Sequence, residues 1–249
     1  MAAAVKLHRH IGRRRAACFL AEGPNLVEAA LRRGLVSEVF VTEAAMARFG
    51  GMLADVPVHH VTERAAKALS DTVTPVGLVA VCSVPDTDLD DVLAASPRLV
   101  AVAVEISEPG NAGTLIRIAD AMGADAVVLA GHSVDPYNGK CLRASAGSIF
   151  SIPVVAEADT AGAVAALLDS GLRVLATTVD GEVSLDDVEL SQPTAWLFGP
   201  ESHGLAPDVA ASADARVHIP MPGSAESLNV ASAASICLYQ SARAHRRAG

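Results

Sequence analysis

The feature that most constrains the fold is a series of six short apolar segments between Leu99 and Ile219. They read LVAVAVEI, AVVLAG, IPVV, RVLATTV, TAWLFG and ARVHI, and helical patterns separate or follow several of them, at 114–123, 139–147, 160–171 and 227–245. Continuous apolar runs of this length favour strands that are buried on both faces, which is typical of a parallel sheet covered by helices. We therefore predict an α/β domain over residues 97–249 with a mostly parallel sheet.

A smaller α/β unit is predicted over residues 1–88. Helical patterns at 24–34 and 63–71 accompany strand-like runs at 37–43, 56–62 and 76–84. The segment PDTDLDDVLAASPR that follows is polar and is bounded by Pro85 and Pro97, which favours a linker between the two units. No apolar run approaches the roughly 18 residues that a membrane-spanning helix needs, so we expect no membrane contact.

The charge of the chain is unevenly distributed. The formal net charge is −9, which argues against a nucleic-acid partner because phosphate binding needs concentrated Lys and Arg. Residues 1–21, however, carry five basic residues and no acidic one. The basic residues are Lys6, Arg9, Arg13, Arg14 and Arg15. This basic arm fits either RNA contact on one face of the protein or a solvated tail, and charge alone leaves both interpretations open.

The cysteines are far apart and form neither CxxC pairs nor a Cys/His cluster with zinc spacing. They are Cys18, Cys82, Cys141 and Cys237. We interpret them as small buried residues of a protein in the reducing cytoplasm, and we expect no metal site.

Three of the predicted strands end in loops of a similar kind. The loops read SEPGNAGTLIR, PESHGL and PMPGSAESLN, and each places Gly and polar side chains directly after an apolar strand. Ligands of parallel sheets bind where loops leave the carboxyl ends of strands, so these loops predict one shared site. The glycine spacing is not GxGxxG, and no acidic residue ends the strand AVVLAG. Both observations argue against a nucleotide-binding oxidoreductase.

The first two loops offer candidate site residues, most of which also have an ordinary alternative role. Gly110 and Gly113 would let the backbone approach a ligand, and Asn111 is either a ligand contact or a turn residue. Arg117 lies in the first turns of a helix, where its charge opposes the helix dipole, so an anion is expected nearby. Glu201 is either an acceptor that faces the site or a solvated loop acid.

The third loop contains a Ser and an Asn at the start of the last helical pattern. Ser227 fits the helix cap, which is the commonest role of a Ser in this position. Asn229 would then lie inside the first turn, where Asn has a poor helix propensity and no capping role. The cap explains Ser227 and leaves Asn229 to be explained by the site.

Together the segments EPGNAGTLIRIA, LFGPESHGL and IPMPGSAESLNVASAASI resemble the three ordered motifs of the SpoU/TrmH branch of the SPOUT RNA methyltransferases. The segments FLAEGPNLVEAALRRGLVSEVFVTE and LSDTVTPVGLVAV resemble the ribosomal-protein-like substrate-binding domain that precedes the catalytic domain in many members. The resemblance therefore covers nearly the whole chain. One departure is Glu108, where many members carry Asp, and this change keeps the charge.

The resemblance implies a trefoil-knotted catalytic domain that binds S-adenosylmethionine, dimerises to complete each site and methylates a ribose 2′-oxygen of RNA without a metal ion. The catalytic and positioning residues carried over from the motifs are Asn111, Arg117, Glu201, Ser227 and Asn229. The implied cofactor contacts are Thr177, Leu197, Gly199, Ile219, Met221 and Leu228. Because a guanidinium keeps its proton at ordinary pH, we expect Arg117 to bind a phosphate and stabilise the developing alkoxide.

The resemblance also bears on the RNA and on the alternatives to this function. The N-terminal domain favours 23S rRNA over tRNA, because it resembles members that act on the large subunit. A non-catalytic RNA-binding or ribosome-assembly protein is the alternative from another class, and the complete polar set argues against it. We expect RNA to contact the N-terminal domain, its basic arm and local residues such as Lys140 and Arg143.

Overall fold

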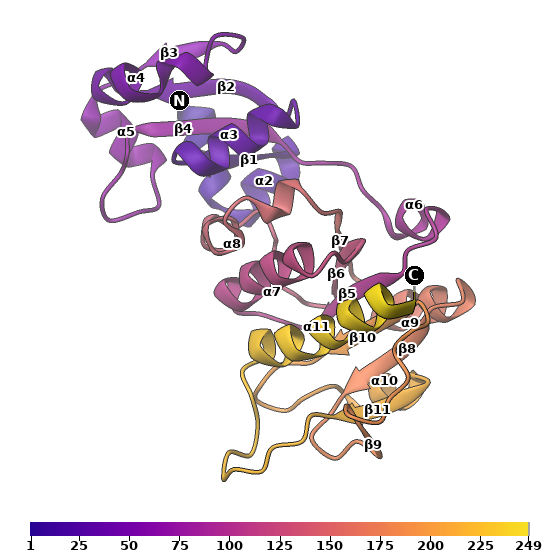
Figure 1. The fold of residues 1–249 in the computed structure, drawn as a ribbon. Helices are drawn as coiled ribbons and strands as arrows, with labels where there is room; N and C mark the ends of the chain where they lie inside the picture. The colour runs from indigo at the N-terminus through magenta and orange to yellow at the C-terminus, as the bar shows by residue number, and fades with distance from the viewer. Residues whose placement is uncertain (249) are drawn as a thin grey trace.

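The computed structural model describes residues 1–248 and contains two sheets (Figure 1). A four-stranded sheet has the order β1-β4-β2-β3, and a seven-stranded sheet has the order β7-β6-β5-β10-β8-β11-β9. The first contains β1 (Cys18–Glu22), β2 (Val36–Val41), β3 (Val58–His60) and β4 (Leu78–Ser83). The second contains β5 (Leu99–Val104), β6 (Ala126–Ala130), β7 (Val154–Glu157), β8 (Arg173–Thr177), β9 (Val183–Ser184), β10 (Thr194–Phe198) and β11 (Ala215–His218).

The seven-stranded sheet is parallel at every pairing, and helices cover both of its faces. Alternate residues of β5 point to opposite sides, so Leu99 and Ala101 join one apolar cluster and Val100 and Val102 join another. The first cluster includes residues of α7 (Pro109–Ala121), α8 (Gly139–Ser145) and α11 (Val230–Ala248). The second includes residues of α6 (Leu89–Ala94), α9 (Thr160–Asp169) and α10 (Pro207–Ser212). The predicted α/β fold with a mostly parallel sheet is confirmed.

The four-stranded sheet is mostly antiparallel. β4 pairs antiparallel with β1 and β2, and the short strand β3 runs parallel to β2. Its helices are α3 (Pro24–Arg32), α4 (Glu43–Phe49) and α5 (Glu63–Leu69), with a 3-10 turn η2 at Gly50–Met52. The sequence prediction did not include β1, in which Phe19 and Ala21 are fully buried.

The basic arm is folded. It forms α1 (Ala2–Val5), the 3-10 turn η1 (Lys6–His8) and α2 (His10–Ala16). Ala4 and Leu7 are buried in an apolar cluster with Phe40 and Leu69, so the first residues belong to the N-terminal body. The interpretation of the arm as a solvated tail is therefore wrong.

The segment between the two sheets also packs against the molecule. It contains α6, whose Leu89 and Val92 are buried in the core of the seven-stranded sheet. Asp88 caps this helix, because its side chain accepts a hydrogen bond from the backbone N–H of Asp91. Within residues 1–248, no helix is both long and apolar enough to cross a membrane.

Helix α7 begins at Pro109, five residues before the start of the predicted helix. Pro109 stands in the first turn, where its missing N–H costs nothing, and Glu108 Oε1 accepts a hydrogen bond from the N–H of Gly110 at 3.1 Å. Gly113 faces α8, and a Cβ at this position would lie 2.3 Å from the carbonyl oxygen of Cys141. Gly113 thus serves helix packing, and the prediction that it brings backbone close to a ligand is wrong.

Candidate active site

Three polar side chains meet beyond the carboxyl ends of β5 and β10, and we call them the Glu201 cluster: Asn111, Glu201 and Asn229. Glu201 Oε1 accepts hydrogen bonds from Asn111 Nδ2 at 2.6 Å and from Asn229 Nδ2 at 2.9 Å. Asn229 Nδ2 also lies 3.1 Å from Asn111 Oδ1, to which it donates. Bonds to a carboxylate are stronger than those between neutral groups, so the two amides hold Glu201 in a defined position.

The start of α11 explains why Asn229 is part of this cluster. Asn229 Oδ1 accepts from the backbone N–H groups of Ala231 at 3.0 Å and Ser232 at 3.3 Å, and Glu201 Oε1 accepts from Val230 N at 3.3 Å. These bonds satisfy N–H groups that a helix start leaves unpaired, so Asn229 is the cap of α11. The prediction that Ser227 caps the helix and that Asn229 lies within it is wrong, since α11 begins at Val230.

Arg117 and Ser227 are not hydrogen-bonded to the cluster. Arg117 is exposed on α7 six residues after Asn111, so the two side chains point about 120° apart around the helix. Within residues 1–248, its side chain has no hydrogen-bond or ion-pair partner in the structure. Ser227 is exposed, and it lines the cavity described next.

A cavity of about 680 Å³ lies beside the Glu201 cluster, a size typical of sites for small cofactors. Its wall comes from the loops after β8, β10 and β11. Five of the six predicted cofactor contacts line it, namely Thr177, Gly199, Ile219, Met221 and Leu228. The sixth, Leu197, has a fully buried side chain, and its carbonyl accepts a hydrogen bond from Thr177 Oγ1 at 2.8 Å.

Two details of the cavity suit a bound ligand. Gly199 lies so close to the neighbouring chain that a Cβ there would be 2.5 Å from the Leu205 nitrogen, so the wall requires glycine. Thr178 Oγ1 is buried without a hydrogen-bond partner among the described residues. An unpaired buried hydroxyl is costly, and a polar group of a ligand can satisfy it. No sequence motif pointed to Thr178, although it directly follows Thr177 at the end of β8.

The two basic residues predicted near the site both pair with acids. Lys140 Nζ lies 2.5 Å from Glu108 Oε1, and this hydrogen bond holds the pKa of Glu108 below its usual value. Arg143 Nη2 lies 3.3 Å from Asp71 Oδ2. An RNA phosphate would have to compete with these carboxylates for Lys140 and Arg143.

The residues that the structure describes contain no group of three His, Cys, Asp or Glu side chains that could hold a metal ion. The charged side chains of the cavity wall are Asp180, Glu201, Arg216 and Glu226.

Comparisons with known proteins match both parts of the chain. The SpoU rRNA Methylase family matches residues 98–239, and the MRM3-like substrate binding domain matches residues 2–80. The chain is 36% identical to the 23S rRNA (guanosine(2553)-2′-O)-methyltransferase RlmP of Bacillus subtilis, over 94% of this chain and 92% of that protein.

Solved structures agree with this match. The SpoU methyltransferase AviRb from Streptomyces viridochromogenes, in complex with AdoMet, superposes with a TM-score of 0.86 at 30% identity, over 99% of this chain and 98% of that one. The AdoMet-bound rRNA methyltransferase from Sinorhizobium meliloti has a TM-score of 0.86 at 28% identity, over 97% of this chain and 93% of that one.

Proposed function

Because this chain belongs to the SpoU rRNA methylase family, we propose that its substrate is 23S ribosomal RNA. The chain is an S-adenosylmethionine-dependent RNA methyltransferase that acts on a ribose 2′-oxygen. The observation that carries the proposal is the Glu201 cluster, which stands beside a cavity of cofactor size. A full-length match to a 23S rRNA enzyme, including the substrate-binding domain, supports ribosomal RNA over tRNA.

S-adenosylmethionine supplies an electrophilic methyl group when it is bound. Thr177, Gly199, Ile219, Met221 and Leu228 would hold it, because they line the cavity, and the unpaired hydroxyl of Thr178 would give it one more polar contact. The remaining tasks of the protein are to bring the ribose hydroxyl into line, to help remove the proton that the hydroxyl loses, and to stabilise the charge that develops on its oxygen.

The Glu201 cluster suits that task. Glu201 Oε1 already accepts three hydrogen bonds, whereas Oε2 accepts none from the described residues and remains available to the RNA. Asn111 and Asn229 fix the carboxylate, and Ser227 lies at the cavity wall beside it. The guanidinium of Arg117 is a donor with no acceptor atom, so its role is to bind a phosphate of the RNA and to stabilise the alkoxide.

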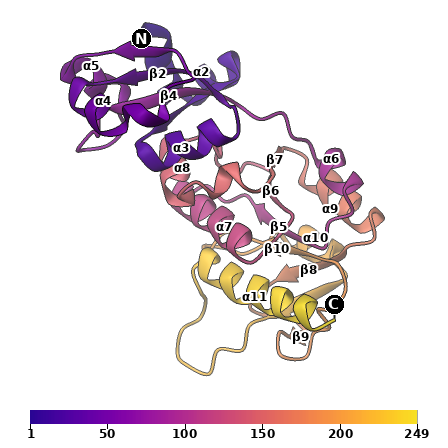
Figure 2. The ribbon, with the colours of Figure 1, turned by 45° about the horizontal axis from the view of Figure 1, so that its top comes forward.

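The homodimer with its knotted domains is also part of this proposal. Ile236 and Tyr239 are 37% and 50% exposed on α11, which runs alongside α7 (Figure 2). Arg117 is exposed on α7. A second copy that packs on this α7–α11 face would cover the apolar side chains, and it would bring further groups to Arg117.

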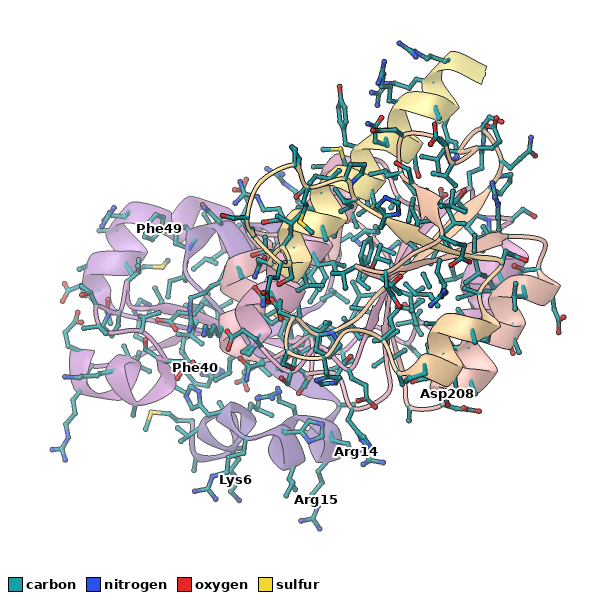
Figure 3. All side chains as sticks on the ribbon, turned by 90° about the horizontal axis from the view of Figure 1, so that it is seen from below. Lys6, Arg14, Arg15, Phe40, Phe49 and Asp208 are labelled. Carbon is teal, nitrogen blue, oxygen red and sulfur yellow. The ribbon has the colours of Figure 1, made fainter. Side chains whose placement is uncertain are left out.

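The outer face of the basic arm supports RNA contact by the N-terminal domain. Lys6, Arg14 and Arg15 are exposed and extend outward from the same edge of the molecule (Figure 3). The rest of the chain is strongly acidic, so this edge is a preferred place for the phosphate backbone.

We place the enzyme in the cytoplasm. All four cysteines are free, and burial raises the pKa of Cys82 and Cys141 to about 12, so both thiols stay protonated. Free cysteines in positions of this kind are typical of a reducing compartment.

Methyl transfer to separated RNAs tests the function. Purified protein is incubated with methyl-labelled S-adenosylmethionine and either 23S rRNA or total tRNA, and the labelled nucleotides are identified after complete digestion. We expect one 2′-O-methylated nucleotide in 23S rRNA. Label confined to tRNA would move the substrate to tRNA, and absence of transfer to either RNA would favour a non-catalytic RNA-binding protein.

A further inference from the structure

The arginine at position 13 differs from its neighbours in the basic arm. Its residue surface is 5% exposed, and it is the one charged residue that the described part of the chain buries. Arg14 and Arg15, next to it on α2, are exposed. A buried guanidinium requires partners for its donors, because an unpaired charge in the interior is costly.

The partners of Arg13 come from both parts of the molecule. Its Nε and Nη2 both lie 2.7 Å from Asp135 Oδ2, in the loop that follows β6 of the seven-stranded sheet. Its Nη1 donates to the carbonyls of Leu7 at 2.9 Å and His8 at 3.0 Å, in the arm itself. The guanidinium therefore fastens the N-terminal arm to the catalytic domain.

Aromatic packing continues this contact. The rings of Phe19 on β1 and Tyr137 in the Asp135 loop have centroids 4.7 Å apart, and Phe150 in the 3-10 turn η3 (Ser148–Phe150) lies 6.0 Å from Phe19. Asp135 Oδ1 accepts from the N–H of Tyr137 at 2.9 Å, so the same carboxylate holds both Arg13 and the aromatic residue. Burial raises the pKa of Tyr137, which keeps this ring neutral.

The loop that holds Arg13 leads directly to the active site. Asn138 Oδ1 accepts a hydrogen bond from Lys140 N at the start of α8, and Lys140 Nζ reaches Glu108 at the start of α7. α7 and α8 pack closely through Gly113. α7 carries Asn111, a member of the Glu201 cluster. Rigid helices and bonded side chains therefore connect Arg13 with the reacting centre.

We propose that the Arg13–Asp135 ion pair is a positioning device that sets the N-terminal domain, and the RNA bound to it, relative to the Glu201 cluster. The proposal rests on the proposed function for the identity of the RNA. Arg13 and Asp135 are positioning residues, because they act through the two domains and do not touch the reacting atoms. The covalent connection between the sheets does not set this arrangement alone, because α6, the helix within residues 84–98, packs only on the seven-stranded sheet.

Geometry rather than stability is the expected benefit of this pair. Replacing a buried ion pair with apolar groups is often neutral for stability, whereas a charge fork with fixed directions specifies one arrangement. A misplacement of about 1 Å at a reacting centre can cost about 100-fold in rate, so small errors in domain placement would be visible in catalysis.

The test compares three variants of the full-length protein. Asp135→Asn keeps the shape of the side chain and removes its charge, and Arg13→Gln removes the guanidinium group. Arg32→Gln is the matched control, because Arg32 pairs with Glu28 inside α3 and bridges no domains. Thermal unfolding, S-adenosylmethionine affinity by calorimetry, small-angle X-ray scattering and single-turnover transfer to saturating 23S rRNA are measured for each.

We expect Asp135→Asn and Arg13→Gln to bind the cofactor as the unaltered protein does, to give a more extended scattering profile, and to transfer methyl about tenfold more slowly. Arg32→Gln should match the unaltered protein in cofactor affinity, scattering profile and transfer rate. An unchanged rate in folded Asp135→Asn protein would overturn the proposal, and so would a slower rate that is matched by an equal loss of cofactor affinity. If the unaltered protein modifies no rRNA, the proposed function fails, and unchanged scattering of the variants would then overturn the positioning role independently.

Discussion

The two parts of the molecule differ in where their polar groups lie. The central strands of the seven-stranded sheet are buried at every position, and the Glu201 cluster lies in loops and helix starts beyond the strand ends. The N-terminal unit instead carries exposed charge along the outside of its arm. A buried parallel sheet fixes a few groups accurately, whereas an exposed basic edge offers many interchangeable contacts.

This difference predicts a division of labour. Chemistry should depend strongly on single residues of the Glu201 cluster, because each makes bonds that no neighbour replaces. RNA affinity should depend weakly on single arm residues, because each contributes one phosphate contact among several. The following changes are ordered from the largest expected effect to the smallest.

Glu201→Gln should have the largest effect on the rate of methyl transfer. The amide keeps the shape of the side chain and removes the charge that Asn111 and Asn229 hold in place, so we expect single-turnover transfer to fall about 100-fold. Asp208→Asn, at an exposed acid at the start of α10 (Figure 3), is the control and should leave the rate unchanged. Equal rates for the two variants would contradict a role for Glu201.

Glu substitutions at both Ile236 and Tyr239 should test whether the proposed homodimer is needed for activity without disturbing the fold of the single chain. Both positions are exposed, so the thermal unfolding temperature should change little, while charge on the α7–α11 face opposes association. Because each site of the proposed homodimer would lose its partner subunit, we expect a monomer by light scattering and more than about tenfold slower transfer. A fully active monomer would show that one chain is sufficient.

Two substitutions at Asn229 distinguish its roles as helix cap and as site residue. Asn229→Ala removes both, so it should lower the free energy of unfolding by about 1 kcal/mol and slow transfer about tenfold. Asn229→Ser can still cap α11 but has no amide to donate to Glu201. It should therefore keep most of the stability and show the same slow transfer. Restored activity in the Ser variant would reduce Asn229 to a cap.

The combined change Arg14→Gln and Arg15→Gln tests whether the N-terminal arm binds RNA. Both residues are exposed, unlike Arg13, and truncation of the arm would also remove the buried residues Ala4 and Leu7. We expect RNA affinity to fall about fivefold and its salt dependence to become shallower by about two phosphate contacts. An unchanged salt dependence in a filter-binding titration would remove these residues from the RNA interface.

Glu105→Gly should have the smallest effect, and it concerns the strand end itself. Glu105 follows β5 with φ of 54°, a left-handed conformation that favours glycine. We expect the substitution to raise the free energy of unfolding by about 0.5–1 kcal/mol, measured in urea. A loss of stability would mean that the Glu105 side chain makes a compensating contact.

Much of the catalytic domain could be predicted from the sequence, and less of the N-terminal unit. Continuous apolar runs such as LVAVAV are recognisable because both faces of their strands are buried. The strand CFLAE is short and follows a basic segment, so its burial depends on its pairing with β4, which no local pattern shows. The sequence did not indicate helix α6, because the helix is only six residues long and its two buried apolar residues are too few to show a periodicity.

The candidate site shows the same limit. Spacing and residue type identified the three loops that form the Glu201 cluster, and the amides could be named because they lie in recognisable motifs. The roles within the cluster were not accessible. That Asn229 caps α11 depends on where the helix starts, and that Arg13 is buried beside exposed Arg14 depends on Asp135, more than a hundred residues away.

The division of labour is tested most directly by one paired experiment on 23S rRNA. The dissociation constant for the RNA and the transfer rate at saturating RNA are measured for Glu201→Gln and for the combined Arg14→Gln and Arg15→Gln variant. We expect the first variant to lower only the saturated rate and the second to raise only the dissociation constant. If both variants change the same quantity, the arm and the Glu201 cluster do not separate RNA binding from methyl transfer.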